Sequence, residues 1–569
     1  MLMIAALLAV SAALEFPPEL VDFAPMPGNP VFEAAGPGHW DECIRERGWI
    51  LHEDGVYHLW YTGHRKQGDD ARKLGYAVSA DGVHWQRHPD NPVHAEGWVE
   101  DMMVVKAGDT YHMFAEGRND ETHRLSSTDR VHWTDHGRLT ILKKNGEPIL
   151  PGPFGTPTAW LEDGVWYFFY ERNDEAVWLA TSTDLATWTN VQDEPVLPCG
   201  PGDYDRKMIA LDQIVKHRGT YYAYYHGLIP DTRPGEWTSA VAASADLVHW
   251  EKYPGNPIVG GDKSSPVLVP DGDAFRLFTM HPAVWAYEHR NPGGAAPTPR
   301  ADSFTVWQLP NQTRSQMMSY VVQTAGGRLA VIDGGRAGDA AYLRSFLMER
   351  GGRVDVWYVT HLHDDHCEAL SVLLADPQGL EIGEICASLP DAEWFRKACS
   401  PSELPPCEAF MAALAAAGRA VKPLSPGDMR GLDGVLVQVL GGCNPEILKN
   451  PLNNSSLVLR LSDARKSVVF LADLGVEGGA KLLAGPQAGW LPSDVVQTAH
   501  HGQNGVGEAV YRRINAKTCL WPTPKWLWDN DAGGGEDSGR YRTKEVRGWM
   551  DALGVQNHLR MFDGLQKVE

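Results

Sequence analysis

A repeated motif in the first half of the chain restricts the folds that it can adopt. The pattern Ser-x-Asp-x-x-x-Trp begins at Ser79, Ser127, Ser182 and Ser244, at intervals of roughly 50 to 60 residues. A hairpin of alternating apolar residues around a turn precedes each copy, and a fifth hairpin covers residues 267–280. Units of this length with four antiparallel strands are typical of propeller blades. The repeat predicts a five-bladed β-propeller over residues 25–288, in which Asp closes each turn and Trp fills the space between blades.

The charge of the chain is unevenly distributed. The formal net charge is −22, of which about −18 lies in residues 1–302 and about −4 in the remainder. A protein that binds nucleic acid normally presents a basic face. The propeller is therefore not expected to bind nucleic acid, and neutral or polyol substrates fit it better.

The N-terminus carries a short apolar segment. Residues 2–14 are apolar apart from Ser11, and residues 10–12 offer a small-residue cleavage site. This pattern predicts a signal peptide over residues 1–13 and a secreted or periplasmic protein. Because the segment contains no Lys or Arg, a misassigned start or a buried strand is the alternative, and the protein would then be cytoplasmic. It is too short to span a bilayer, and no other stretch of the sequence is expected to do so.

The second half of the chain has a different pattern. Residues 289–302 are rich in Pro, Gly and Ala without periodicity, which predicts a linker, and a second domain follows over residues 303–569. Apolar runs that indicate strands alternate there with helical stretches, so this domain is predicted to be mixed α and β. Among the eight cysteines, Cys399 and Cys407 are close in sequence, and one disulfide could form between them.

A cluster of potential metal ligands follows the apolar segment 354–358. In the run His361-x-His363-x-Asp365-His366, His361 and His363 point the same way on an extended chain and can bind one cation. The turn beyond them brings Asp365 and His366 to a second cation. Three further short motifs stand at the ends of predicted strands: Asp333-Gly334-Gly335, Asp473-Leu474-Gly475 and Ala499-His500-His501-Gly502. The sequence therefore predicts a binuclear metal centre.

These motifs resemble those of the metallo-β-lactamase superfamily, in particular the hydrolase domain of ComEC-type DNA-uptake proteins, which also has a strand like residues 453–459 and a His-His-Gly turn. The resemblance implies an αββα sandwich with two divalent metal ions, zinc above all. His361 and His363 would hold the first ion, and Asp473 would bridge to the second. The remaining ligands of the second ion would be Asp365, which we also count among the catalytic residues, His366 and His500.

Three features of this domain leave alternatives open. No histidine occurs between His366 and His500, so the third histidine usual at the first ion is absent, and Asn454 stands nearest to its position. His501 could be a proton donor or a packed neighbour. The Trp-rich segment 521–528 could be core or an aromatic lid over the metals, with Lys525 offering charge to an anionic substrate.

The blades resemble the propellers of the arabinanase, invertase and levansucrase clan, including glycoside hydrolase family 43. In that clan the first residues of the innermost strands supply the catalytic carboxylates, and Glu46, Asp101 and Asp212 occupy these positions here. Glu116 and Glu171, at the far ends of strands, are second choices. The third blade has no such carboxylate. A non-catalytic propeller that binds sugar is therefore the alternative to an active glycosidase, and Trp40, Trp49 and Trp98 could stack on sugar rings.

The sequence as a whole thus predicts a secreted two-domain hydrolase. A propeller would cleave or bind carbohydrate, and a binuclear metallohydrolase domain would follow it. The alternatives are a sugar-binding propeller that targets a phosphodiesterase or esterase, and a fusion of two unrelated units.

Overall fold

The structure is a computed structural model that describes residues 14–45, 47–67, 71–150, 153–230, 235–272, 274–290 and 303–569. The predicted signal peptide and all but the first two residues of the predicted linker lie outside these ranges. The chain forms two compact units that divide at Pro299 and Arg300. None of the described helices is both long and apolar enough to cross a membrane.

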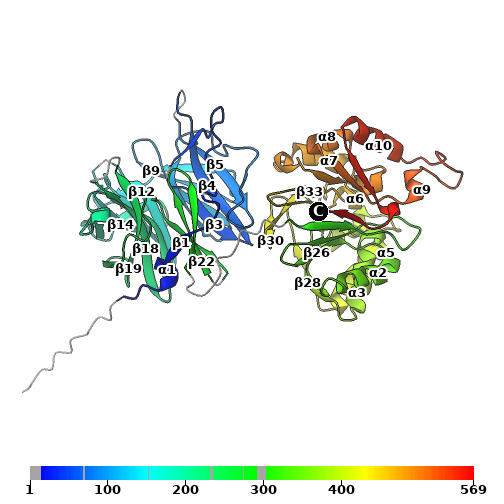
Figure 1. The fold of residues 1–569 in the computed structure, drawn as a ribbon, viewed down its shortest axis with the longest axis horizontal. Helices are drawn as coiled ribbons and strands as arrows, with labels where there is room; N and C mark the ends of the chain where they lie inside the picture. The colour runs from blue at the N-terminus through cyan, green and yellow to red at the C-terminus, as the bar shows by residue number, and fades with distance from the viewer. Residues whose placement is uncertain are drawn as a thin grey trace, which may run out of the picture. The chain divides into compact units, whose positions relative to one another are not determined.

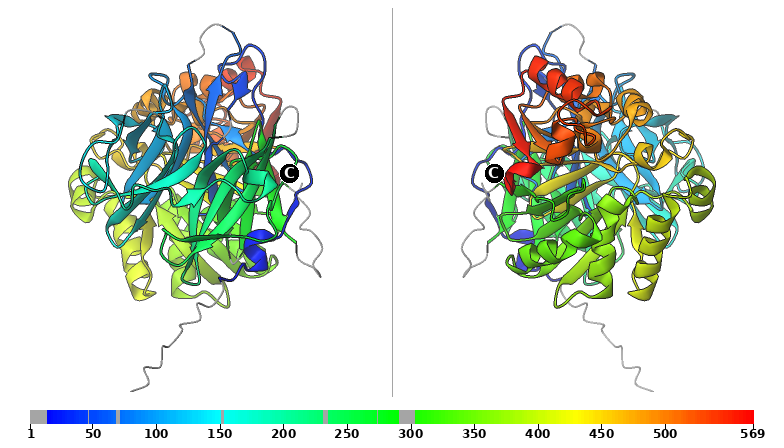
Figure 2. Two further views of the ribbon diagram at one scale, coloured as in Figure 1. Left: turned by 90° about the vertical axis from the view of Figure 1, so that its left-hand side faces the viewer. Right: turned by 90° about the vertical axis from the view of Figure 1, so that its right-hand side faces the viewer.

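The described part of the first unit contains five sheets of mainly antiparallel strands, one for each predicted blade (Figure 1; Figure 2, left). The strands of blade one are β2 (Cys43–Ile44), β3 (Trp49–Glu53), β4 (Val56–His64), β5 (Lys73–Ser79) and β6 (Gln86–Arg87). Blade two contains β7 (Glu100–Ala107), β8 (Thr110–Glu116), β9 (Thr122–Ser127) and β10 (Thr134–Arg138). Blade three is built on β12 (Gly155–Glu162), β13 (Val165–Glu171), β14 (Ala176–Ser182) and β15 (Thr187–Asn190), to which β11 (Thr140–Leu142) and β16 (Leu197–Pro198) add. Blade four contains β17 (Ile209–His217), β18 (Thr220–Ile229), β19 (Glu236–Ser244) and β20 (Trp250–Lys252).

The fifth blade joins two distant parts of the chain. Its strands β21 (Val267–Asp271), β22 (Ala274–Met280) and β23 (Val284–His289) follow the predicted hairpin, and β1 (Phe23–Pro25) completes the sheet by pairing with β23. The short helix α1 (Pro18–Val21) precedes β1. A strand from the start of the unit therefore pairs with its last strand and closes the ring.

The repeated motif forms the same turn in each blade that carries it. In the last copy Asp246 accepts hydrogen bonds from the backbone N–H groups of Val248 and His249 and from the Ser244 hydroxyl. Asp81, Asp129 and Asp184 make equivalent bonds. The repeated Asp thus satisfies backbone donors at a strand-to-strand turn, as the sequence predicts.

The second unit is a sandwich of two seven-stranded sheets with helices on both outer faces (Figure 1; Figure 2, right). In order across the first sheet, the strands are β29 (Val421–Pro423), β28 (Glu381–Ala387), β27 (Arg353–Val359), β26 (Leu329–Asp333), β25 (Ser319–Gln323), β24 (Thr305–Gln308) and β37 (Gln566–Val568). The second sheet runs β30 (Met429–Leu432), β31 (Val435–Gly441), β32 (Val458–Ser462), β33 (Ser467–Phe470), β34 (Val495–Gln497), β35 (Thr518–Trp521) and β36 (Asn557–Arg560). This is the αββα arrangement that the resemblance implies.

Helices lie beside each sheet of the sandwich. The first sheet is covered by α2 (Ala340–Met348), α3 (Asp364–Ala375) and α5 (Leu404–Ala416), and α4 (Ala392–Ala398) precedes α5. The second sheet is covered by α7 (Val476–Ala484), α8 (Glu508–Ile514) and α10 (Thr543–Ala552). The short helices α6 (Pro451–Asn454) and α9 (Lys525–Trp528) lie in the connections.

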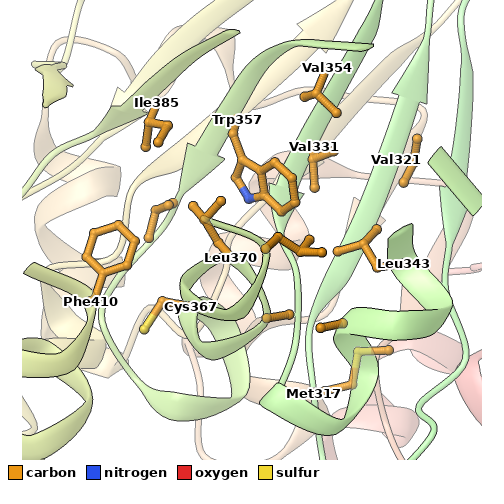
Figure 3. Close-up of a cluster of buried hydrophobic side chains, with 14 of the residues drawn as sticks. Met317, Val321, Val331, Leu343, Val354, Trp357, Cys367, Leu370, Ile385 and Phe410 are labelled. Atoms are coloured by element: carbon orange, nitrogen blue, oxygen red, sulfur yellow. The ribbon is translucent and has the colours of Figure 1, made fainter. Parts of the chain in front are cut away.

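Two apolar cores hold the sandwich together. One lies between the sheets and includes Tyr320, Leu459 and Phe470. The other packs the first sheet against its helices, and in Figure 3 Trp357 of β27 lies among side chains that include Leu343 and Leu370. Because Trp357 also donates a 2.7 Å hydrogen bond to the carbonyl of Asp333, this core fixes the ends of β26 and β27, where the predicted metal ligands begin.

All eight cysteines are free. The disulfide that could link Cys399 to Cys407 is therefore not formed. Cys407 is buried and its Sγ lies 3.6 Å from the carbonyl oxygen of Leu362, so it serves as a packed side chain behind the ligand loop.

Candidate metal centre and axial propeller site

The predicted metal ligands meet at one edge of the sandwich. His361 and His363 follow β27, Asp365 and His366 form the first turn of α3, and Asp473 follows β33. The 3-10 turn η4 (Ala499–Gly502) follows β34. Because these are ends of parallel strands or the loops that follow them, they lie at the same edge of the two sheets.

The ligand-type side chains form two groups. In each group one ligand atom per residue lies within 4.8 Å of the others, and the groups are His361, His363, Asp473 and Asp365, His366, His501. Asp473 connects them, because its Oδ2 lies 4.0 Å from Nε2 of His361 and 3.4 Å from Nε2 of His366. His501 Nε2 lies 3.5 Å from the same oxygen. Two adjacent cation positions that share one carboxylate are the arrangement expected of a binuclear centre.

Several polar atoms at this point have no hydrogen-bond partner among the described residues. They include Oδ1 of Asp473, and also Nε2 of His366, Nε2 of His501 and Oδ2 of Asp365, which lie 3.2 to 3.5 Å from other ligand-type atoms of the cluster without a well-directed hydrogen bond. A buried nitrogen or oxygen without a partner is costly unless something else binds it. Imidazole and carboxylate donors suit divalent transition-metal ions, so these residues fit the metals that the fold implies.

The electrostatics of the site also favour positive charge between the carboxylates. Burial alone would raise the pKa of Asp473, but the imidazoles of His501, His366 and His500 lower it well below its usual range. Burial would lower the pKa of His366, yet the carboxylates of Asp473 and Asp333 raise it well above its usual range. Bound cations would supply this positive charge in place of protons.

Asp333 fixes the orientation of the ligands from behind. It adopts a left-handed backbone conformation (φ 59°) at the end of β26. Its carboxylate accepts a 2.7 Å hydrogen bond from Nδ1 of His366 and 2.8 Å bonds from the amide and hydroxyl of Thr360. The other ring nitrogen, Nε2, is thereby turned towards Asp473. A carboxylate behind a ligating histidine fixes the tautomer and strengthens the ligand.

The two histidines of the His-His-Gly turn differ from the prediction. His501, not His500, belongs to the second ligand group, and its Nε2 lies 3.2 Å from Oδ2 of Asp365. His500 Nε2 lies 3.7 Å from Oδ2 of Asp473 and 3.3 Å from the amide nitrogen of Asn453. Both histidines have positive φ, 50° and 54°, and this left-handed turn directs the second imidazole into the centre. The His-His-Gly pattern does not reveal which ring points inwards.

Asn454 does not occupy the position of the missing third histidine. Its Oδ1 accepts a 2.8 Å hydrogen bond from the amide of Gly478, and its Nδ2 donates a 2.7 Å bond to the carbonyl of Lys449. The side chain therefore anchors the start of α7. Sequence reasoning missed Glu403, whose Oε1 lies 3.4 Å from Nε2 of His363. Only the tertiary fold brings the residue before α5 to this loop.

The Trp-rich segment contains one buried tryptophan and two that make contacts outside the core. Trp521 is fully buried, as expected of a core residue. Trp526 donates a 3.0 Å hydrogen bond to the carbonyl of Arg314, and the Arg547 guanidinium lies 4.1 Å from the Trp528 ring. The Lys525 ammonium pairs with Asp529, so its charge is already balanced.

In the propeller, buried Arg47 links the innermost strands of several blades. Its guanidinium donates to the carbonyl oxygens of Asp101, Pro157 and Asp212, at 3.1, 2.6 and 3.2 Å. It also donates to the hydroxyl of Thr158 at 2.7 Å. Arg47 thus stabilises the inner strands of blades two, three and four around one side chain.

The inner strand entrances share an irregular backbone. Arg47, Asp101, Thr156 and Ser265 all have left-handed φ angles, between 44° and 58°. The pairing register shifts at Glu100/Met103, Gly155/Thr158 and Leu211/Gln213. Bulges of this kind redirect side chains and are concentrated at functional sites.

The structure places the predicted propeller carboxylates as follows. Glu46 lies outside the described residues. Asp101 is partly buried at the entrance of blade two. Asp212 is fully buried, with both carboxylate oxygens 3.0 Å from Nδ1 of His226 and Oδ1 3.5 Å from Nε of Arg47. Asp212 is therefore held between two cationic or hydrogen-bonding groups.

Glu116 and Glu171, the second choices, both point towards Gly155. Both are buried and converge on Gly155, where an added Cβ would overlap both carboxylates. Burial, together with the carboxylate of Asp174, raises the pKa of Glu171 to about 7. Burial and neighbouring carboxylates raise the pKa of Glu116 well above its usual range. A carboxylic acid that keeps its proton near neutral pH is suited to general-acid catalysis.

Of the tryptophans expected near sugar, Trp49 is buried, and Trp40 packs against Tyr61 with ring centroids 5.8 Å apart. Trp98 lines a cavity instead.

Comparison with known proteins gives matches for both units. The metallo-beta-lactamase superfamily matches residues 313–513, and the N-terminal domain of glycosyl hydrolases family 32 matches residues 48–196. The 1,2-beta-oligomannan phosphorylase of Thermoanaerobacter sp. is 23% identical over 216 residues, 35% of this chain and 69% of that protein. An uncharacterized protein of Mycobacterium tuberculosis is 24% identical over 225 residues, 36% of this chain and 73% of that protein. A solved glycosyl hydrolase from Bacteroides ovatus has 16% identity and a TM-score of 0.38, and the alignment covers 50% of this chain and 97% of that one.

Sheet topology, ligand geometry and the family matches together support one description: the chain is a five-bladed propeller that resembles those of glycoside hydrolases, followed by a metallo-β-lactamase domain.

Proposed function

We propose that the C-terminal domain is a metal-dependent hydrolase with two divalent ions, zinc in the first instance. The observation that carries this proposal is the position of Asp473, whose Oδ2 lies within 4.0 Å of imidazole nitrogens from both ligand groups. His361 and His363 would hold one ion, and Asp365, His366 and His501 the other. Bound ions of this kind supply Lewis acidity and make water a stronger nucleophile at neutral pH.

Two residues beside the ligands would have further roles, Asp333 in positioning a ligand and His500 in contacting the substrate. Asp333 holds His366 in one tautomer, so that Nε2 stays available as a ligand. His500 lies next to Asp473 with 16% of its side chain accessible, and it would contact the substrate.

The test compares Asp473→Ala with Asn454→Ala in the full-length chain, using metal analysis and a screen of phosphodiester, ester, thioester and lactam substrates. Loss of Asp473 should remove bound metal and most hydrolysis, several kcal/mol of barrier. Asn454→Ala should keep both the bound metal and the hydrolysis, because the Asn454 side chain bonds to the backbone near α7 and not to the metal ligands. Full metal content and activity in the Asp473 variant would refute the proposal.

For the propeller, we propose cleavage of a carbohydrate, supported by the raised pKa of Glu171 and the converging carboxylate of Glu116. Glu171 would donate the proton to the leaving oxygen, and Asp101, Asp212 and Glu46 would bind the sugar or assist the attack. Acid and base in such a pair act from opposite sides of the bond.

The experiment is a screen of oligosaccharides with and without inorganic phosphate, because one relative is a phosphorylase of 1,2-β-oligomannan. Cleavage in water alone indicates hydrolysis, and dependence on phosphate indicates phosphorolysis. Binding without cleavage under either condition would favour the non-catalytic, targeting propeller. A secreted or periplasmic location is part of the proposal, and fractionation of expressing cells tests it.

A further inference from the structure

The propeller contains a cavity beside the axial carboxylates that the roles above do not use. It has a volume of about 510 Å³ and is lined by Lys73, Trp98, Gly117, Arg118, His123 and Asp135, among others. Trp98 lies two residues before the inner strand β7, and Arg118 lies two residues after the end of β8. Because Glu100 of β7 pairs in register with Glu116 of β8, the cavity adjoins the proposed catalytic pair. Its size is within the range of small-ligand sites.

One side of the cavity carries an arginine for which the described residues offer no ion pair. The Arg118 guanidinium lies 4.7 Å from the Trp98 ring centroid, and Arg72 lies 5.1 Å from it. Arg72 and Arg45 both pair with Glu100, which also accepts a 2.8 Å hydrogen bond from the Trp98 indole. Arg118 has no ion-pair partner in the part of the chain that the structure describes. Its guanidinium is therefore held against an aromatic face while its N–H groups stay available.

A buried histidine supplies a second ligand-binding atom. His123 is 9% exposed and lines the cavity, and its Nδ1 lies 3.0 Å from Oδ2 of Asp135. Its Nε2 is buried without a hydrogen-bond partner among the described residues and faces Gly117, where an added Cβ would lie 3.9 Å away. With the Nδ1 proton directed at Asp135, Nε2 is an acceptor suited to a sugar hydroxyl.

We infer that this cavity binds a sugar that carries an anionic group, a carboxylate or a phosphate ester, with Arg118 binding the anion and His123 a hydroxyl. The inference rests on the proposed carbohydrate function of the propeller and specifies its substrate class. The unit is strongly acidic, about −18 over residues 1–302. General repulsion would keep anionic sugars away, so a locally unpaired arginine next to a buried acceptor gives a selective site for them.

The test is binding of the full-length chain to an array of oligosaccharide pairs that differ only in one carboxylate or one phosphate. A uronate or phosphorylated sugar should bind more tightly than its neutral partner, and the preference should weaken with salt. Arg118→Gln should reduce this binding about tenfold. Arg218→Gln, the same charge change on an exposed turn of blade four, should leave it unchanged.

The outcomes separate the two hypotheses. Preference for the uronate or for the phosphate supports the inference and identifies which anion is bound. Equal binding of neutral and charged partners, or equal behaviour of the two arginine variants, overturns the inference but leaves a carbohydrate-binding propeller. Absence of binding to every member of the array overturns both the inference and the proposed propeller function.

Discussion

Replacing Glu171 with glutamine should stabilise the propeller at neutral and alkaline pH but have little effect at pH 5. The pKa of Glu171 is about 7 in the folded chain against an ordinary value of 4.5. A carboxyl whose pKa rises on folding contributes stability that is fully present below about pH 4.5 and is lost as the pH rises through about 7. One pKa unit corresponds to about 1.4 kcal/mol, so ionised Glu171 costs the folded state about 3 kcal/mol at pH 8.5. The neutral amide of Glu171→Gln avoids this cost and can still accept the hydrogen bond from Asp174.

Differential scanning calorimetry of the full-length chain at pH 5 and pH 8.5 measures this effect. The propeller transition of the variant should rise by about 5 °C or more at pH 8.5 and stay near that of the wild type at pH 5. Glu175→Gln, an exposed change nearby, should shift neither transition. An equal shift of the Glu171 variant at both pH values, or none at pH 8.5, would refute the account of a buried, protonated Glu171 and with it the proposed general acid.

Asp333→Asn should weaken metal affinity about 10- to 100-fold, because the carboxylate that positions His366 is lost. Titration of chelator-treated protein with zinc measures this, and a curve that matches the wild type would count against it. Glu403→Gln should weaken zinc binding in the same titration, whereas Glu408→Gln, an exposed change in the same helix, should not; identical curves would show that Glu403 does not position its histidine. Asp246→Asn should destabilise the propeller at pH 7 by no more than about 1 kcal/mol, since the carboxylate is half exposed. Although burial opposes it, hydrogen bonds from the adjacent turn lower the pKa of Asp246 to about 2, so its contribution is present above about pH 4 and disappears as the pH falls through 2. Equal destabilisation at pH 7 and pH 2, measured by thermal unfolding, would contradict this explanation.

The blade repeat and the metal motif could be predicted from sequence because both depend on local spacing. Asp246 and its equivalents accept hydrogen bonds from backbone N–H groups two and three residues away. A short stretch of sequence is therefore enough to predict the turn. His361 and His363 are likewise fixed by the two-residue period of an extended chain. Strand β27 contains the predicted apolar segment 354–358, because apolar runs of this length indicate strands in buried sheets.

Contacts between distant segments depended on the tertiary structure. The closing strand β1 pairs with β23 more than 250 residues later, and no local pattern identifies this partner. The sequence could not decide between His500 and His501, because a left-handed turn, not residue type, determines which ring faces Asp473 and Asp365. Glu116 and Glu171 come from different blades, and their raised pKa values arise from joint burial against Gly155, which exists only once the blades pack around the axis. The sequence by itself thus determined the blade turns and the ligand-type residues, because both depend on residues a few positions apart. Only the tertiary structure decided which of the candidate side chains face one another, because that depends on burial and on contacts between distant segments.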